Sequence, residues 1–272
     1  MTAAVLAYTE RDHLTWRTLY ARMRPQWARY ANEHYLAGLD CLRLDPDHVP
    51  SLDEVNRFLH PRTGFVARPV DGYIPAFEFF DRLRRREFPT TVTMRPPEQL
   101  DYLPEPDIFH DIAGHVPMHT DPAFADALVA FGECAHVAAA ASDPQVLVSR
   151  VKALARFFWF TVEFGLMRTP RGLKAYGSGL LSSHGELGHA IESKEVQRYP
   201  LQLEWVIHQA FAIDHYQPLL FTIESFEELY REARRLAEWM RDGRLDHVAP
   251  GEPEVNERDL VSFLRGSAGG GL

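Results

Sequence analysis

The chain has few cysteines, no long apolar run and no excess of basic side chains, and each of these absences excludes a class of protein. Cys41 and Cys134 are too few for a disulfide framework and too far apart for a zinc knuckle of the Cys-x2-Cys kind. No apolar run approaches the ~20 residues that a membrane-spanning helix needs. The formal net charge of −9 argues against nucleic-acid binding, which needs a positive surface facing the phosphates.

The overall composition is that of an ordinary globular chain, with 46% hydrophobic and 25% charged residues among 272. The N-terminal stretch MTAAVLAYTERDH turns polar too early for a secretory signal, and the two cysteines fit a reducing cytoplasm. Neither a repeat nor a linker interrupts the sequence. We therefore predict one domain over residues 1–265, followed by a disordered tail at 266–272.

Apolar residues recur at helical spacing along most of the chain, which predicts a mainly α-helical fold with short strands. The first helix should run over 11–36, with Pro25 dividing it and Gly38 as its stop. A short helix capped by Asp107 should end near 115, because Pro117 disfavours helix just before it. Further helices are expected at 52–59, 75–86, 121–141, 143–167, 185–191, 226–240 and 259–264. Strands are expected at 88–94 and 173–176 and a loop at 64–72, while 203–223 receives no assignment.

Two histidines, His110 and His115, stand five residues apart in the proline-rich segment PEPDIFHDIAGHVP. In a regular helix, side chains at this spacing lie roughly 140° apart and would not share a face. A common target, such as a metal ion, therefore requires a local distortion or a site that wraps around the helix end. Gly114 permits the distortion.

A glutamate, Glu163, lies within the aromatic stretch FFWFTVEFG. In such surroundings a carboxylate is expensive to bury unless it is paired or bound to a metal. Two imidazoles and one carboxylate suit a divalent transition metal, as in the non-heme Fe(II) oxygenases. Zinc hydrolysis is the competing chemistry, because the same ligand set also binds catalytic zinc. Iron is favoured, since the HExxH and HxxEH motifs of zinc proteases are absent and only Asp111 lies adjacent as a base.

Three segments, PEPDIFHDIAGHVP, FFWFTVEFGL and KAYGSGLLSSHGEL, closely resemble the catalytic domain of the pterin-dependent aromatic amino acid hydroxylases. The likeness is greatest to the short bacterial phenylalanine 4-monooxygenases. It covers roughly residues 64–225, with the motifs in the family's order and spacing. The resemblance implies the family's catalytic-domain fold, an Fe(II) centre, a tetrahydropterin cosubstrate and an aromatic L-amino acid that is hydroxylated with O2.

The resemblance also assigns metal and cofactor roles to residues of this sequence. The iron ligands would be His110, His115 and Glu163. Phe79 would stack on the pterin ring. The other cofactor-binding positions would be Gly72, Ile74 and Ala76, which match backbone contacts, and Asp111, which matches the acidic position after the first iron ligand.

For the amino acid substrate, Arg95 matches the arginine that grips the carboxylate, a task suited to a bidentate guanidinium. Asp107 would orient Arg95, and Ser182 would hydrogen-bond the first ligand histidine. The pocket for the aromatic ring would be lined by Pro106, Trp159 and Phe164.

Two positions depart from the family pattern. Phe158 stands where the family usually has tyrosine, and Leu103 occupies a site that is threonine in some longer relatives. The chain lacks room for the regulatory domain and tetramer-forming helix of the animal enzymes, so we expect a stand-alone catalytic domain that is a monomer or weak dimer. The expected reaction converts L-phenylalanine to L-tyrosine. The alternatives are hydroxylation of tryptophan or of another ring position, a zinc hydrolase, and a catalytically silent aromatic-binding protein.

Overall fold

The computed structural model describes residues 7–72, 74–101, 106–211 and 213–268. These residues form helices and two small sheets, which confirms the expected mainly α-helical fold with short strands. The longer helices are α1 (Glu10–Tyr30), α2 (Glu33–Leu42), α3 (Leu52–Thr63), α4 (Ala76–Arg84), α6 (Pro122–Ala139), α7 (Pro144–Phe158), α9 (His184–Glu192), α11 (Phe226–Arg241) and α12 (Glu257–Ala268). The shorter ones are the 3₁₀ helix η1 (Pro97–Gln99), the π-helices η2 (Phe109–His115) and η3 (Trp159–Glu163), and α5 (Val116–His119), α8 (Ser178–Leu181) and α10 (Leu203–Val206).

One sheet pairs β1 (Val66–Val70) in parallel with β2 (Glu87–Thr91). The expected loop at 64–72 was therefore wrong. Its proline, Pro69, pairs with Thr90 in a two-stranded sheet, where every strand is an edge and a proline is tolerated. The second sheet has the order β4-β3-β6-β5, with only the β3–β4 pair antiparallel. Its strands are β3 (Leu166–Thr169), β4 (Gly172–Ala175), β5 (Gln197–Pro200) and β6 (Leu219–Ile223).

The long N-terminal helix divides at Asn32 rather than at Pro25, which lies inside α1. At Asn32 the backbone N–H donates to the Ala175 carbonyl of β4 at 2.8 Å, so a contact with a distant strand draws the chain out of the helix. The Asn32 side chain then caps α2 by accepting from the backbone N–H of His34. Gly38 does not end α2, which continues to Leu42.

Where a helix start depends on a local cap, the sequence prediction was confirmed. Ser51 and Glu54 form the expected reciprocal capping box of α3, and Asp121 caps α6. Helix ends were less well predicted, because α3 continues four residues further, to Thr63, and α7 stops at Phe158 instead of 167. Helix α12 continues to Ala268, beyond the expected end at 264, while residues 269–272 lie outside the described part of the chain.

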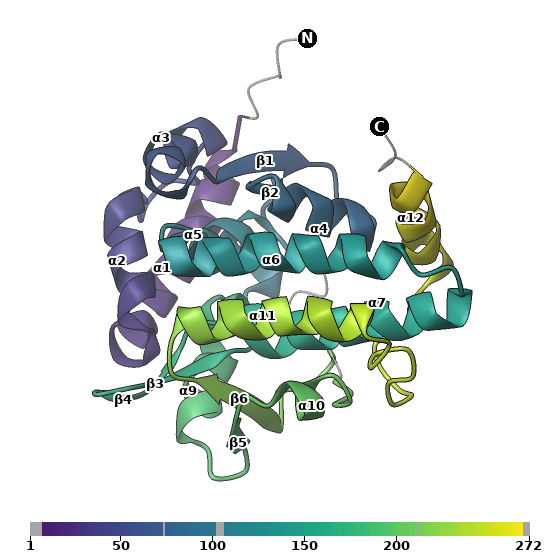
Figure 1. Cartoon of the computed structure of the whole chain (residues 1–272). Helices are drawn as coiled ribbons and strands as arrows, with labels where there is room; N and C mark the ends of the chain where they lie inside the picture. Colours follow the sequence, from purple (N-terminus) through teal and green to yellow (C-terminus); the bar gives the residue numbers. More distant parts are fainter. Residues whose placement is uncertain (1–6, 73, 102–105, 212, 269–272) are drawn as a thin grey trace.

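Helix α6 is the centre of the core, packing against α4 on one side and α11 on another. In Figure 1, α6 and α11 lie side by side, with the β1–β2 sheet above them and the larger sheet below. Gly132 allows α4 to approach closely, because a Cβ there would lie 2.5 Å from the Phe80 carbonyl oxygen. This contact fixes the position of α4, which carries Phe79.

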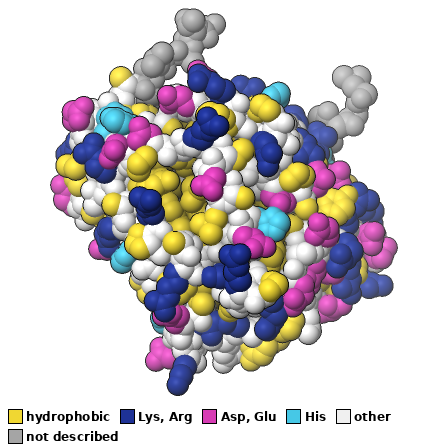
Figure 2. All heavy atoms as spheres, turned by 90° about the vertical axis from the view of Figure 1, so that its left-hand side faces the viewer, with side chains coloured by type: hydrophobic (Ala, Val, Ile, Leu, Met, Phe, Trp, Pro, Cys, Tyr) yellow, Lys and Arg dark blue, Asp and Glu magenta, His cyan; other side chains and the backbone are white. Residues whose placement is uncertain are grey.

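The molecular surface carries charges of both signs. On the face shown in Figure 2, acidic and basic side chains are interspersed, with hydrophobic atoms between them. No single-sign patch of the kind that binds phosphates dominates that face. Among the described residues, none of the helices combines the length and the apolar character that membrane crossing would require.

The contact between α2 and the segment after His115 leaves no space for a side chain at Gly38. A Cβ built there would lie 2.0 Å from the carbonyl oxygen of Pro117, well inside van der Waals contact. Because Pro117 belongs to the helix that follows the two histidines, this close approach anchors the histidine segment.

We expect Gly38→Ala to lower the free energy of unfolding by about 1–3 kcal/mol or more, because the added methyl group must displace backbone. Denaturant unfolding measures the loss. The matched control is Gly188→Ala in α9, where the nearest atom is a Tyr30 ring carbon at 3.4 Å. That change should be neutral or stabilising by about 0.5–1 kcal/mol. Equal stability of Gly38→Ala and the parent would contradict the close packing of α2 on Pro117.

Candidate metal centre

The histidine segment is a π-helix, η2, over Phe109–His115. The N–H of Val116 donates to the Asp111 carbonyl five residues earlier, which closes the wider turn. Residues five apart consequently lie on neighbouring turns, and the Nε2 atoms of His110 and His115 are 3.2 Å apart. The distortion that the spacing required is therefore present.

The flanking residues of η2 behave partly as expected. Asp107 Oδ1 accepts the backbone N–H of His110 at 3.0 Å, as a capping side chain does. The expected end of the helix at His115 was wrong, because α5 follows directly. Pro117 lies in the first turn of α5, where its missing N–H has no helical partner to lose.

Glu163 is the last residue of a second π-helix, η3, which extends α7. Its Oε1 lies 3.2 Å from His115 Nε2, and its Oε2 lies 3.8 Å from His110 Nε2. One ligand atom from each of the three residues falls within 4.8 Å of the others. A pair of imidazole nitrogens and a carboxylate at this separation fits a divalent transition metal such as iron.

Two serines of the segment that contains α8 support the three side chains. Ser182 Oγ lies 2.7 Å from His110 Nδ1, as expected, which leaves Nε2 to face the centre. Ser178, which the sequence analysis did not single out, lies 2.9 Å from His115 Nε2 and donates to Glu163 Oε2 at 2.8 Å. Ser178 lies within the motif KAYGSGLLSSHGEL, and that motif was the feature of the sequence that could have indicated it.

The electrostatics favour the metal-binding protonation states of His110 and Glu163. At His115, burial acts to lower the pKa, but the Glu163 carboxylate outweighs it and raises the pKa. Burial, helped by the neighbouring His115, lowers the pKa of His110 to about 4, so this imidazole is neutral at pH 7. Burial opposes ionisation of Glu163, but His115 and His110 outweigh it and lower the pKa of the carboxyl to about 2. A neutral imidazole and an ionised carboxylate are the metal-binding forms.

Asp111 lies outside this cluster of three. Its carboxylate is buried and accepts the backbone N–H of Thr91 in β2 at 2.6 Å. Burial raises the pKa of Asp111 to about 7. The side chain therefore ties η2 to the sheet that precedes Arg95.

Arg95 and Asp107 form a buried bidentate pair, with distances of 2.7 Å (Nε–Oδ2) and 2.9 Å (Nη2–Oδ1). Burial opposes the charge on Asp107, but the Arg95 guanidinium outweighs it and lowers the pKa of the carboxyl. The expected orientation of Arg95 by Asp107 is present in the structure. Because Asp107 also caps His110, one carboxylate connects the guanidinium to the histidine segment.

Trp159 is held in place by two aromatic rings and one hydrogen bond. Its ring lies 4.5 Å from that of Phe164 and is stacked at 4.2 Å on that of Phe211, while its indole N–H donates to Gln217 Oε1 at 3.2 Å. Phe211 and Gln217 come from the segment 203–223 that received no assignment, so sequence reasoning missed them. Pro106, the third expected pocket residue, is exposed at the start of the histidine segment.

The segment expected to hold the pterin leads into α4. Gly72 has a positive φ of 75°, Ala76 is the first residue of α4, and Phe79 and Ile74 are half-buried. The Phe79 ring stands edge-on to Phe158 at 5.6 Å. Phe158 is also edge-on to Phe80 and Phe131, so the departure from tyrosine sits within an aromatic cluster. Leu103, the other departure, lies outside the described residues.

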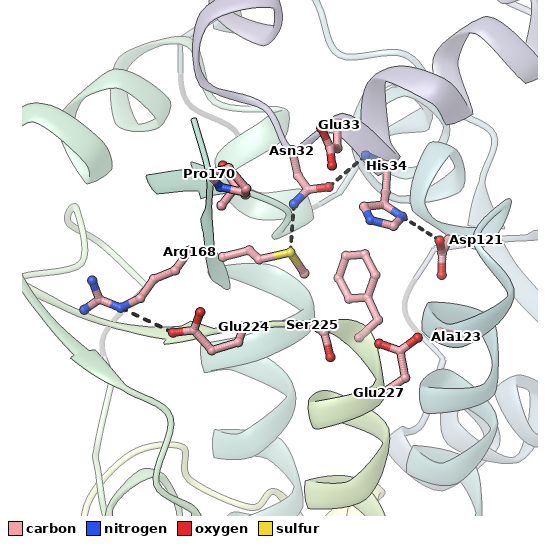
Figure 3. Close-up of a pocket in the computed structure, with 13 residues that line it drawn as sticks. Asn32, Glu33, His34, Asp121, Ala123, Arg168, Pro170, Glu224, Ser225 and Glu227 are labelled. Carbon is pink, nitrogen blue, oxygen red and sulfur yellow. Dashed lines mark hydrogen bonds and ion pairs between the residues drawn. The ribbon is translucent and has the colours of Figure 1, made fainter. Parts of the chain in front are cut away.

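A pocket of about 150 Å³ lies elsewhere, where α2, α6 and α11 begin (Figure 3). His34 Nδ1 lies 2.7 Å from Asp121 Oδ2, and Asn32 donates to the sulfur of Met167. The lining includes none of the expected site residues. His34 and Asp121 pair with each other, as do Arg168 and Glu224, and we assign no function to the pocket.

Residues 2–244 match the model of the biopterin-dependent aromatic amino acid hydroxylases, and the chain belongs to this family. Its similar relatives include the phenylalanine-4-hydroxylases of Ralstonia nicotianae (41% identity over 234 residues, 86% of this chain and 72% of that protein) and Chromobacterium violaceum (40% over 223 residues, 82% and 73%). These matches confirm the family resemblance.

Solved structures agree with this membership. The Chromobacterium violaceum phenylalanine hydroxylase with bound oxidized Fe(III) is similar with a TM-score of 0.82 and 37% identity, covering 92% of this chain and 88% of that one. The Legionella pneumophila phenylalanine hydroxylase has a TM-score of 0.81 and 33% identity, with 89% and 94% covered. The expected catalytic-domain fold is confirmed.

We expect Asp107→Asn to lower the free energy of unfolding by about 3 kcal/mol at pH 7, because the buried Arg95 charge loses its counterion. The pKa of Asp107 is below its usual 3.8, so its contribution is present above that value and is lost as pH falls through the lowered pKa. The difference between parent and variant should therefore stay constant from pH 7 to 5 and shrink only below 3.8.

Denaturant unfolding across this pH range measures the difference. The matched control is Asp101→Asn, which removes the same charge from an exposed pair with Arg22 and should cost less than about 1 kcal/mol. A difference as small as the control's would show that the Arg95–Asp107 pair does not stabilise the fold.

Proposed function

We propose that this protein hydroxylates the ring of L-phenylalanine to give L-tyrosine, using O2, Fe(II) and tetrahydropterin. The observation that carries the proposal is the convergence of His110, His115 and Glu163 from two π-helices, in a chain of the biopterin-dependent hydroxylase family. The phenylalanine-4-hydroxylases among its relatives support the choice of substrate. Family membership disfavours the zinc hydrolase and the silent binding protein.

The metal would be held by His110, His115 and Glu163. When bound, the iron and the tetrahydropterin supply the activation and two-electron reduction of O2. The protein's part is to hold the ligands in the form that binds metal. Ser182 and Ser178 fix the imidazole and carboxylate orientations, and burial keeps His110 neutral.

The amino acid would be oriented by its carboxylate. Among the described residues, Arg95 uses three of its five N–H groups on Asp107 and on the Leu100 carbonyl. Two N–H groups, one on each terminal nitrogen, are then available for a substrate carboxylate. Asp107 holds the guanidinium plane, so binding costs little further ordering of the side chain.

The aromatic ring of the substrate would rest against Trp159 and Phe164, with Pro106 at the rim. Because Phe211 and Gln217 immobilise Trp159, the pocket wall is rigid and limits the orientations of a bound ring. The tetrahydropterin would lie on α4, with Phe79 against its ring and Gly72, Ile74 and Ala76 along its edge. Asp111 would hold the histidine segment against β2.

We also propose that the chain folds as one catalytic domain and that the protein is a monomer or weak dimer in the cytoplasm, with no nucleic-acid or membrane partner. The free thiols of Cys41 and Cys134 support a reducing compartment. The interspersed charges on the face in Figure 2 support the absence of a nucleic-acid partner there.

Removal of one ligand should abolish specific metal binding. We expect His110→Ala and Glu163→Gln to weaken Co(II) or Fe(II) affinity by more than 100-fold, because loss of a supporting residue alone costs about 10–100-fold. Ser178→Ala should weaken metal affinity by the smaller factor of about 10–100-fold. Calorimetric titration of the metal-free proteins measures the affinities, with the exposed His60→Ala as control. Unchanged metal affinity in both ligand variants would remove the centre from the proposal.

Product analysis tests the reaction itself. With equimolar phenylalanine and tryptophan, O2, Fe(II) and tetrahydropterin, we expect L-tyrosine to dominate by about 5- to 150-fold, the discrimination that an apolar pocket provides for one or two ring atoms. Chromatography identifies the products, and omission of the pterin should eliminate them. Dominant hydroxytryptophan or meta-tyrosine would overturn the substrate assignment but not the metal site.

A further inference from the structure

Helix α4 has no cap of its own. Its N-cap residue is Pro75, whose side chain offers no hydrogen bond. The first N–H groups of a helix have no partner within it, so α4 needs acceptors from elsewhere. They come from α12: Asp259 Oδ1 accepts the N–H of Ala76 at 2.8 Å, and Ser262 Oγ accepts that of Phe77 at 3.3 Å.

One face of α12 makes these contacts. Asp259, Ser262, Phe263 and Gly266 are spaced three, four and seven residues from the first, which places them on the same side of a helix. The Phe263 side chain is fully buried, with its ring 5.3 Å from that of Phe77. A Cβ at Gly266 would lie 2.1 Å from the Phe77 ring, so α12 lies as close to α4 as a glycine allows. Figure 1 shows α12 beside α4.

The connection to α12 is also held in place. Arg156 of α7 has a fully buried side chain, and its guanidinium donates only to backbone carbonyls among the described residues. The acceptors are Ile207, Ala249, Pro250, Gly251 and Glu252. The family match ends at residue 244, so the acceptors at 249–252 and helix α12 all lie beyond the matched region.

We propose that α12 is a positioning element for the tetrahydropterin site, which acts by capping the helix that carries Phe79; this rests on the proposed function. Ala76, a predicted backbone contact of the pterin, is the residue whose N–H Asp259 binds, and Phe79 lies one turn further. The negative charge of the Asp259 carboxylate also interacts favourably with the positive, N-terminal end of the α4 dipole.

The affinity for tetrahydropterin depends on how well ordered the first turn of α4 is. Without its acceptors, the first turn of α4 frays in a fraction of the molecules. The apparent affinity for a ligand equals the intrinsic affinity multiplied by the fraction of protein that is competent to bind it. Asp259 and Ser262 are thus positioning residues for the pterin, while Arg95 and Trp159 lie on other elements and keep their places.

The test is the variant Asp259→Ala/Ser262→Ala in the full chain loaded with Fe(II). We expect tetrahydropterin to bind more weakly by calorimetry, by up to about fivefold, equivalent to at most ~1 kcal/mol. The KM for L-phenylalanine should change less than twofold. Backbone amides 76–78 should exchange hydrogen faster. Asp259→Asn, which keeps an acceptor oxygen, should recover part of the affinity. Glu257→Ala, an exposed carboxylate in the first turn of α12, is the matched control.

Two results would overturn the inference while leaving the proposed function intact. One is pterin affinity in the double variant equal to that of the parent. The other is a parallel loss of pterin binding, phenylalanine binding and thermal stability, which would mean that α12 only supports the fold. A parent protein that fails to bind tetrahydropterin would instead overturn the proposed function, and the inference with it.

Discussion

The widened turn between His110 and His115 is the constraint on which the site depends. A regular helix would place these imidazoles on different faces, whereas the π-helix brings their Nε2 atoms to 3.2 Å. Such a turn is rare because its local geometry is unfavourable, so tertiary contacts must hold it. The Tyr35 hydroxyl donates to the Ala113 carbonyl at 2.7 Å, and α2 presses on Pro117 just beyond the turn. Helix α2 thereby stabilises the histidine segment without contributing a candidate metal ligand.

The same solution recurs at Glu163, where α7 passes into a second π-helix before the chain enters β3. Both distorted segments face the α8 segment, whose Ser178 and Ser182 each contact at least one of the three side chains. The candidate centre is therefore built from three segments, and hydrogen bonds between side chains of different segments set its geometry. Burial keeps His110 neutral, and His115 outweighs the effect of burial on Glu163 and keeps that carboxylate ionised.

How far the sequence could predict this structure depended on whether a feature is local. The caps at Ser51 and Asp121 involve residues three apart, and both were predicted correctly. The strand β1 and the break at Asn32 depend on partners distant in the chain, so local reading assigned a loop and a kink at Pro25 instead. The three candidate ligands were predictable from their motifs. Phe211 and Gln217 were not, because only the fold brings them to Trp159.

The double use of Asp107 has a thermodynamic consequence. One of its oxygens accepts from both the Arg95 guanidinium and the His110 backbone. Two binding events that share a group in this way are linked, and linkage is reciprocal. If the amino acid carboxylate binds Arg95 and the metal binds His110 as proposed, then whatever factor the amino acid adds to the metal affinity, the bound metal must add the same factor to the affinity for the amino acid. The order in which the two bind then changes the route but not the total free energy.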